Sequence, residues 1–123
     1  MIGIIGAMSI EIDEIVKKLD NKSEYSYKEY AFTSGTIFNK DIVVCKCGIG
    51  KVNSALCTQI LISEFDVDAI VNTGVAGALH SELDVQDIVI STDAIQYDVD
   101  TTAFGDPKGT IPRMESSVFV ADE

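Results

Sequence analysis

Three short strand-like segments, each followed by glycine, are the feature that most restricts the fold of this sequence. Residues 2–7, 41–46 and 69–72 are rich in Ile and Val, and each runs into a turn that contains glycine. Apolar runs of this length, bounded by turn residues, are typical of buried strands. Because helical patterns separate them, we predict an α/β fold with a largely parallel sheet. Ligands should then bind where the carboxyl ends of the strands meet.

The spacing of apolar residues predicts two helices between these segments. One should begin at Ser9, a residue type that favours helix N-caps, and the other should run over residues 51–64. The buried stripe of the first is predicted to be Ile12, Ile15, Val16 and Leu19, and that of the second Val52, Ala55, Leu56 and Ile60.

The remaining segments are predicted to be strands, turns and a loop. Segments around residues 27–34 and 41–46 should pair as a hairpin through the turn at residues 38–40. Residues 20–22 are expected to break the regular structure after the first helix. A fourth apolar strand is expected at residues 88–91, before an acidic loop over residues 97–104.

The charge of the chain excludes some classes of partner. Twenty acidic residues stand against nine basic ones, a formal net charge of −11, and Arg113 is the single arginine. Without a basic stripe to neutralise phosphates, we expect no nucleic-acid partner. No apolar run approaches the roughly 20 residues that a membrane helix needs. Residues 1–8 have neither a basic leader nor a cleavage site, so a cytoplasmic protein with no membrane partner is expected.

The cysteines and the histidine do not indicate a metal site. Cys45 and Cys47 lie two residues apart on a predicted strand and should share one face as reduced core thiols. His80 is the only histidine and lies in a polar segment, whereas a metal site needs several ligands. Residues 48–53 supply only the first two glycines of the dinucleotide-binding fingerprint. We therefore expect neither a metal nor a cofactor.

Glu11 is the carboxylate that most clearly indicates chemistry. It lies at the border of the first helix's apolar stripe and in its first turn, where the helix dipole keeps a carboxylate ionised. It also follows the first strand at the expected ligand edge, within reach of a bound water or a sugar hydroxyl. A phosphate site would favour basic side chains instead, so this turn favours water as the acceptor. The alternative is an acid placed there only for the dipole.

Four motifs resemble those of the 5′-methylthioadenosine/S-adenosylhomocysteine nucleosidase family. In chain order they are residues 3–8 with Glu11, residues 48–53, residues 72–79, and residues 98–100 followed by 102–105. The resemblance spans nearly the whole chain. It implies a three-layer αβα fold with a mixed, largely parallel sheet, like that of nucleoside phosphorylases. It also implies hydrolysis of the bond between adenine and thioribose, as in methionine salvage, by a homodimer that binds a small nucleoside.

The same resemblance assigns roles to particular residues. The glutamate matching Glu11 helps to activate the attacking water. Substrate-binding positions within one subunit are Ala7, Met8, Ile49, Val75, Ala76 and Gly77. Positions that reach the neighbouring subunit's site, around the alkylthio tail, are Thr101, Phe104 and Pro112. Val75 stands where many family members have serine.

The resemblance identifies residues 1–123 as the N-terminal part of a single domain. In the family, the second half carries the acid that protonates adenine and the glutamate that holds the ribose hydroxyls. These 123 residues alone are therefore expected to be inactive. Two alternatives stay open: a phosphate-dependent purine nucleoside phosphorylase, against which the single Arg113 weighs, and a non-catalytic nucleoside-binding module. Binding of adenosine analogues without release of the base would identify the second.

Overall fold

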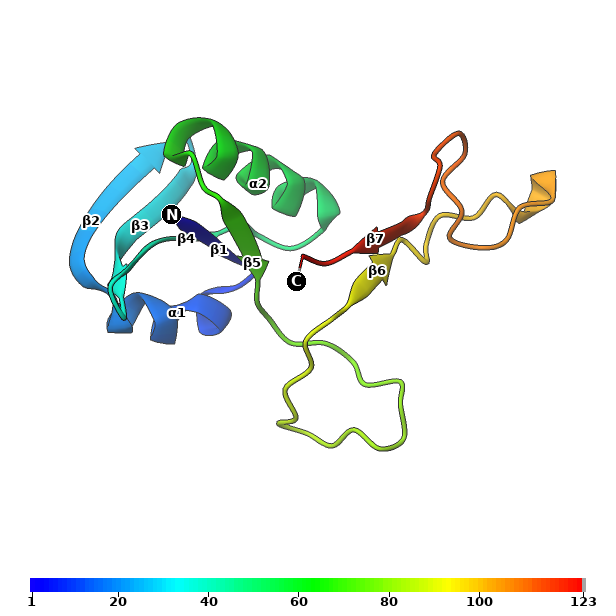
Figure 1. Ribbon diagram of the computed structural model, residues 1–123, viewed down its shortest axis with the longest axis horizontal. Coiled ribbons are helices and arrows are strands. Elements are labelled where there is room, and N and C mark those ends of the chain that lie inside the picture. Colours follow the sequence, from blue (N-terminus) through cyan, green and yellow to red (C-terminus); the bar gives the residue numbers. More distant parts are fainter. Residues whose placement is uncertain (123) are drawn as a thin grey trace. The chain divides into compact units, whose positions relative to one another are not determined.

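The computed structural model describes residues 1–122, which form two units, Met1–Gly77 and the residues from Ala78 onward. Within the described residues the first unit holds a five-stranded sheet in the order β2-β3-β4-β1-β5, with two helices (Figure 1). Its elements are β1 (Ile2–Gly6), α1 (Ser9–Lys18), β2 (Asp20–Tyr27), β3 (Tyr30–Ile37), β4 (Lys40–Lys46), α2 (Lys51–Phe65) and β5 (Ala69–Asn72).

The sheet is mixed and lies between the two helices. β1 pairs in parallel with β4 on one side and with β5 on the other, so that Ile5 lies opposite both Cys45 and Asn72. β2, β3 and β4 pair antiparallel, and the β3–β4 hairpin has its predicted turn at Phe38 and Asn39. The first strand of this hairpin is Tyr30–Ile37 rather than residues 27–34, because residues 28–29 form the turn between β2 and β3. α1 and α2 cover opposite faces of this sheet (Figure 1). The predicted three-layer αβα fold is confirmed.

A hydrophobic cluster fills each side of the sheet. β4 contributes to both, because successive side chains of a strand point to opposite faces. The cluster under α2 contains Ile5, Phe32, Val43, Cys45, Cys47, Cys57 and Leu61. The cluster over α1 contains Ile12, Leu19, Ile42 and Val44. The predicted stripe of α1 is confirmed, since Ile15 and Val16 pack against this second cluster.

The three cysteines are buried free thiols in the α2 cluster, as the sequence predicts for Cys45 and Cys47. Cys45 in β4 and Cys47, just beyond the end of β4, lie in this same cluster, and the Sγ atoms of Cys45 and Cys57 lie 3.5 Å apart. Burial raises the pKa of each of these thiols. They therefore behave as small apolar core residues rather than as nucleophiles.

The predicted buried stripe of α2 is wrong for three of its four residues. Val52 and Leu56 are 75% and 49% exposed, Ala55 is also exposed, and Ile60 is half-buried. The fully buried residues of α2 are Cys57 and Leu61. Apolar residues occur around most of this helix, so periodicity alone does not select the stripe that faces the sheet.

Three other local predictions also need correction. The N-cap of α1 is Met8, and Ser9 is the first helical residue. Residues 20–22 begin β2, whose side chains are all exposed, so no apolar alternation marked it as a strand. Residues 88–91 are irregular and exposed within the described part of the chain, because no neighbouring strand pairs with them there.

The second unit contains a short antiparallel ribbon. β6 (Asp93–Ile95) pairs with β7 (Val118–Val120), and the segment between them includes a 3₁₀ turn, η1 (Thr102–Phe104). The predicted acidic loop over residues 97–104 is therefore irregular apart from this turn. Among the described residues of both units, no helix combines the length and the apolar character that crossing a membrane requires.

Leu61 should be a main anchor of α2 on the sheet. Its side chain is fully buried, so Leu61→Ala should lower the free energy of unfolding by about 2–5 kcal/mol. Ile62→Ala is the matched control, because the Ile62 side chain on the same helix is half exposed and should cost about 0.5 kcal/mol or less. Urea unfolding followed by circular dichroism measures both. Equal losses would contradict this packing of α2.

Candidate active site at the glycine edge

The three glycine-containing segments meet at one edge of the first unit's sheet. Beyond the end of β4, the Cys47 N–H donates a hydrogen bond to the Gly6 carbonyl at 2.9 Å. Beyond the end of β5, the Thr73 N–H donates to the Ile5 carbonyl, also at 2.9 Å. The segments that follow β4 and β5 therefore leave the sheet on either side of the end of β1. This is the arrangement that the sequence predicts for a ligand edge.

Two local features of glycine make this edge possible. A β-carbon at Gly6 would lie 2.5 Å from Ile12 Cγ2, so the close approach of α1 to β1 requires glycine there. Gly48 has a φ of 86°, in the left-handed region that favours glycine, and turns the chain from β4 toward α2. The Asn53 Nδ2 group donates to the Ile49 carbonyl at 2.7 Å and holds that turn.

The Glu11 carboxylate lies across this edge and is held by two backbone amides. Its Oε2 accepts a hydrogen bond from the Met8 N–H at 2.9 Å, and its Oε1 accepts one from the Val75 N–H at 3.2 Å. Met8 follows β1 and Val75 follows β5, so one side chain joins the ends of two parallel strands. Each oxygen keeps a further lone pair for a ligand.

The electrostatics of Glu11 favour its charged form. The hydrogen bond from the Met8 amide lowers the pKa of the carboxyl most, followed by that from Val75, while partial burial opposes them. Glu11 is thus ionised at neutral pH. A fixed, ionised carboxylate can accept a hydrogen bond from water and stabilise positive charge nearby.

The structure places the other predicted residues of one subunit at the same edge. Ala7 and Met8 form the turn between β1 and α1, and Ile49 lies in the turn before α2 with its side chain exposed. Val75, Ala76 and Gly77 follow β5 and are exposed. Of these, Met8 and Val75 bind Glu11 directly. Sequence reasoning missed their role, because a backbone N–H donor leaves no signal in residue type.

The residues predicted to serve a neighbouring subunit belong to the second unit. Thr101 Oγ1 donates to the Thr110 carbonyl at 3.4 Å, and Pro112 is exposed. Phe104 ends η1 with its side chain 88% exposed. The Asp100 carboxylate accepts hydrogen bonds from the Thr102 N–H at 3.1 Å and hydroxyl at 2.7 Å, and so fixes the start of η1. The loop therefore presents an unpaired aromatic ring from an ordered turn.

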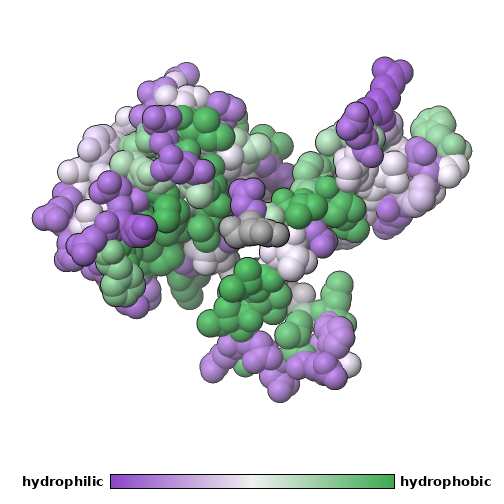
Figure 2. Space-filling view, viewed as in Figure 1, coloured by the Kyte–Doolittle hydropathy of each residue, from purple (hydrophilic) through white to green (hydrophobic). Residues whose placement is uncertain are grey.

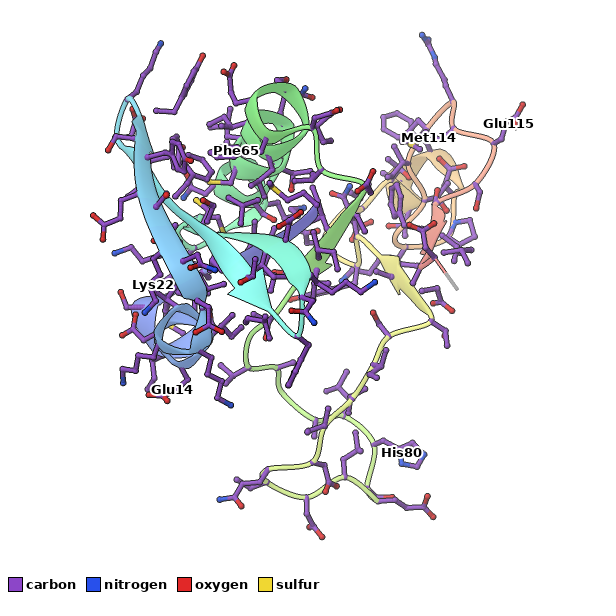
Figure 3. All side chains as sticks on the ribbon, turned by 60° about the vertical axis from the view of Figure 1, so that its left-hand side comes forward. Glu14, Lys22, Phe65, His80, Met114 and Glu115 are labelled. Atoms are coloured by element: carbon purple, nitrogen blue, oxygen red, sulfur yellow. The ribbon has the colours of Figure 1, made fainter. Side chains whose placement is uncertain are left out.

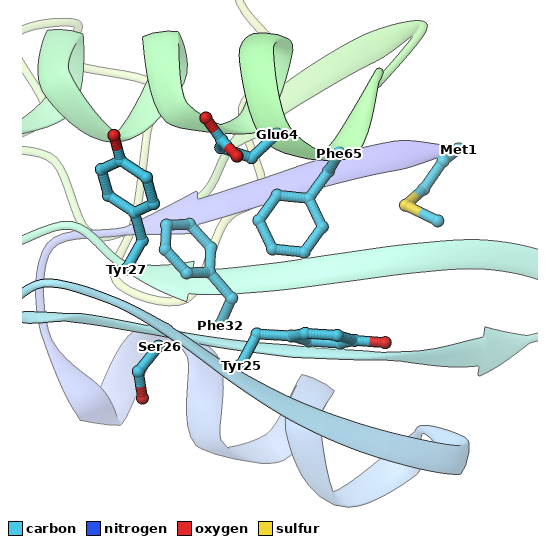
Figure 4. A pocket seen from close by; sticks show the side chains of 7 residues that line it. All are labelled: Met1, Tyr25, Ser26, Tyr27, Phe32, Glu64 and Phe65. Carbon is cyan, nitrogen blue, oxygen red and sulfur yellow. The ribbon is translucent and has the colours of Figure 1, made fainter.

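A separate cavity of about 380 Å³ lies in the first unit beside the end of α2 (Figure 4). Its wall is largely aromatic, with the Phe65 ring 5.0 Å from that of Phe32 and 5.6 Å from that of Tyr25 between centroids. The lining residues are Met1, Tyr25, Ser26, Tyr27, Phe32, Glu64 and Phe65. None of them belongs to the glycine edge, so this cavity is not the candidate site.

Comparison with known proteins identifies the family. The family model described as "Phosphorylase superfamily" matches residues 1–123. This chain belongs to that superfamily. It is 46% identical over 114 residues to the 5′-methylthioadenosine/S-adenosylhomocysteine nucleosidase of Staphylococcus aureus strain JH9, which covers 93% of this chain and 50% of the relative. The chain thus spans about half the length of the curated relatives it matches.

Solved structures of two such nucleosidases and of a futalosine hydrolase share this fold. The nucleosidase of Neisseria meningitidis in complex with methylthio-immucillin-A gives a TM-score of 0.92 at 38% identity, covering 98% of this chain and 52% of that one. The Streptococcus pneumoniae nucleosidase in complex with 8-aminoadenine gives a TM-score of 0.92 at 40% identity, covering 98% of this chain and 53% of that one. Futalosine hydrolase of Helicobacter pylori gives a TM-score of 0.90 at 36% identity, covering 99% of this chain and 52% of that one. The resemblance drawn from the four motifs, and the nucleoside phosphorylase-like fold it implies, are confirmed.

Proposed function

We propose that the protein carrying this chain hydrolyses the N-glycosidic bond of 5′-methylthioadenosine and S-adenosylhomocysteine and releases adenine. The observation that carries this proposal is the Glu11 carboxylate, held by the amides of Met8 and Val75 where β1 and β5 end. The 46% identity to the S. aureus nucleosidase supports the choice of substrate class. Because the relatives are about twice as long, we propose this activity for residues 1–123 acting together with a segment that corresponds to the second half of those relatives.

In the proposed reaction Glu11 acts on water. The ionised carboxylate accepts a hydrogen bond from the water and takes its proton as the water oxygen bonds to the anomeric carbon. The electrons of the breaking C–N bond pass to adenine, which takes up a proton from an acid that the family resemblance places in the second half. The sugar develops oxocarbenium-ion character in the transition state, which a nearby negative charge stabilises.

The charge at Glu11 also favours water over phosphate as the acceptor. A phosphate anion at this edge would face an ionised carboxylate held between two strand ends. The phosphorylase alternative instead needs cationic side chains at the acceptor position. Hydrolysis should therefore proceed at a rate independent of added phosphate.

We further infer that the protein works as a homodimer in the cytoplasm. The exposed Phe104 ring and the exposed apolar residues Ile49, Val52 and Leu56 at the start of α2 support an interface with a second copy. Figure 2 shows apolar surface over α2. The three unbridged thiols are typical of proteins in a reducing compartment. The strongly negative net charge supports the absence of a nucleic-acid partner.

A chimera tests the proposed function directly. Residues 1–123 fused to the second half of the S. aureus relative should release adenine from 5′-methylthioadenosine. Residues 1–123 alone should be slower by about 10²–10⁴-fold or more, since loss of a general acid alone has that effect. Adenine release measured with and without phosphate distinguishes the alternatives. Phosphate-dependent release would favour the phosphorylase, and tight binding of an adenosine analogue without release would favour the binding module.

A further inference from the structure

Gly74 lies directly against the Glu11 carboxylate. A β-carbon at Gly74 would lie 2.7 Å from Glu11 Oε1 and 3.1 Å from its Cδ. The first of these distances is shorter than any ordinary contact between a methyl carbon and an oxygen, so the carboxylate could not keep its place. The residue that follows, Val75, supplies the N–H that binds the same Oε1 atom. Position 74 therefore controls the approach of Glu11 to its second amide.

We propose that Gly74 is a positioning residue for Glu11, whose carboxylate reaches the Val75 amide only because residue 74 has no side chain. The effect of Gly74 on catalysis rests on the proposed function, in which Glu11 activates water. The geometry itself does not, because the hydrogen bond and the close approach belong to the fold of the first unit.

A substitution at Gly74 should move the carboxylate rather than the backbone. Gly74 lies outside the left-handed region of φ, so alanine fits its conformation. The atoms in the way are the end of a flexible glutamate side chain. Gly35 differs in this respect, because a β-carbon there would lie 2.5 Å from the backbone carbonyl oxygen of Asp20. Gly74→Ala should therefore leave the fold intact and displace Glu11.

Displacement should be visible in the titration of Glu11. Without the Val75 hydrogen bond, the pKa of the Glu11 carboxyl should rise toward its ordinary value. On the same helix as Glu11, Asp13 and Glu14 are titratable. The Cys47 thiol also senses the charge of Glu11: burial is the main cause of its raised pKa, and that charge raises it further. The buried thiol is uncharged over the acid range, so it does not obscure the shift.

Carbon-13 NMR titration of the Glu11 carboxyl is the first test. Gly74→Ala should raise this pKa, while Gly77→Ala should leave it unchanged, because among the described residues no atom other than those of Gly77 and its two chain neighbours lies within 4 Å of a β-carbon at Gly77. An unchanged Glu11 pKa in Gly74→Ala would overturn the positioning role. This measurement needs no enzymatic activity, so it remains decisive even where the proposed function fails.

The second test is a double-mutant cycle in the active chimera. Gly74→Ala should lower kcat by about 10²-fold, the typical effect of misplacing a catalytic group by about 1 Å, and should change KM far less. Added to Glu11→Gln, the same substitution should change kcat by less than about twofold, because the carboxylate it displaces is already gone. Full additivity of the two losses would contradict the inference. A chimera that releases no adenine would instead count against the proposed function.

Discussion

Glu11→Gln should lower kcat by about 10²-fold or more in an active protein that carries this chain, with KM little changed. The amide is nearly isosteric with the carboxylate and sits in the same turn of α1, so the fold should persist. It cannot, however, take a proton from water, and it carries no negative charge to stabilise an oxocarbenium-like transition state. Steady-state release of adenine measures the effect.

Glu14→Gln is the matched control for this experiment. Glu14 lies on α1 one turn from Glu11, but its side chain extends away from the sheet (Figure 3) and pairs with Lys17 at 2.5 Å. Its pKa is lowered chiefly by the hydrogen bond with Lys17, which shows that an ionised carboxylate on α1 is not by itself a sign of catalysis. The control should retain normal kcat. If Glu11→Gln also retained normal kcat, Glu11 would serve only to stabilise the start of α1 through the helix dipole.

Phe104→Ala should weaken both the proposed dimer and the binding of substrates with an alkylthio tail. An aromatic anchor buried at an interface contributes about 2 kcal/mol or more, which corresponds to roughly a 30-fold increase in the dimer's dissociation constant. KM should rise for 5′-methylthioadenosine and S-adenosylhomocysteine and change less for adenosine, which lacks the tail. Light scattering over a concentration series and KM values for the three nucleosides measure the two effects.

Phe38→Ala separates this role from the general effect of removing an exposed aromatic ring. Phe38 is 94% exposed in the β3–β4 turn, close to the 88% of Phe104, but it lies outside the motifs that match the nucleosidases. It should change neither the dimer nor the KM values. If Phe104→Ala behaved in the same way, the neighbouring-subunit role of Phe104, Thr101 and Pro112 would be wrong.

Much of the fold follows from local patterns in the sequence. Side chains alternate between the two faces of the sheet along β4 and the residue that follows it, which places Cys45 and Cys47 in one cluster, and the stripe from Ile12 to Leu19 orients α1. The prediction for α1 holds because this helix is apolar on one side and polar on the other. The prediction for β4 holds because this strand is buried on both faces. The glycine segments at the ends of β1, β4 and β5 meet because parallel strands end at one edge. The sequence thus predicts at which edge of the sheet the candidate site lies.

Only the tertiary structure decided which groups act together at that site. Glu11 was recognisable from its place in the first turn, but its contact with the Val75 amide spans 64 positions in the chain and involves a backbone donor that any residue could supply. The need for glycine at position 74 follows from that contact and leaves no local pattern. Local pattern also failed to reveal the strand β2, whose side chains are exposed, and the side of α2 that faces the sheet. Local sequence determines the periodicity of an element, whereas the face that becomes buried depends on neighbours that are distant along the chain.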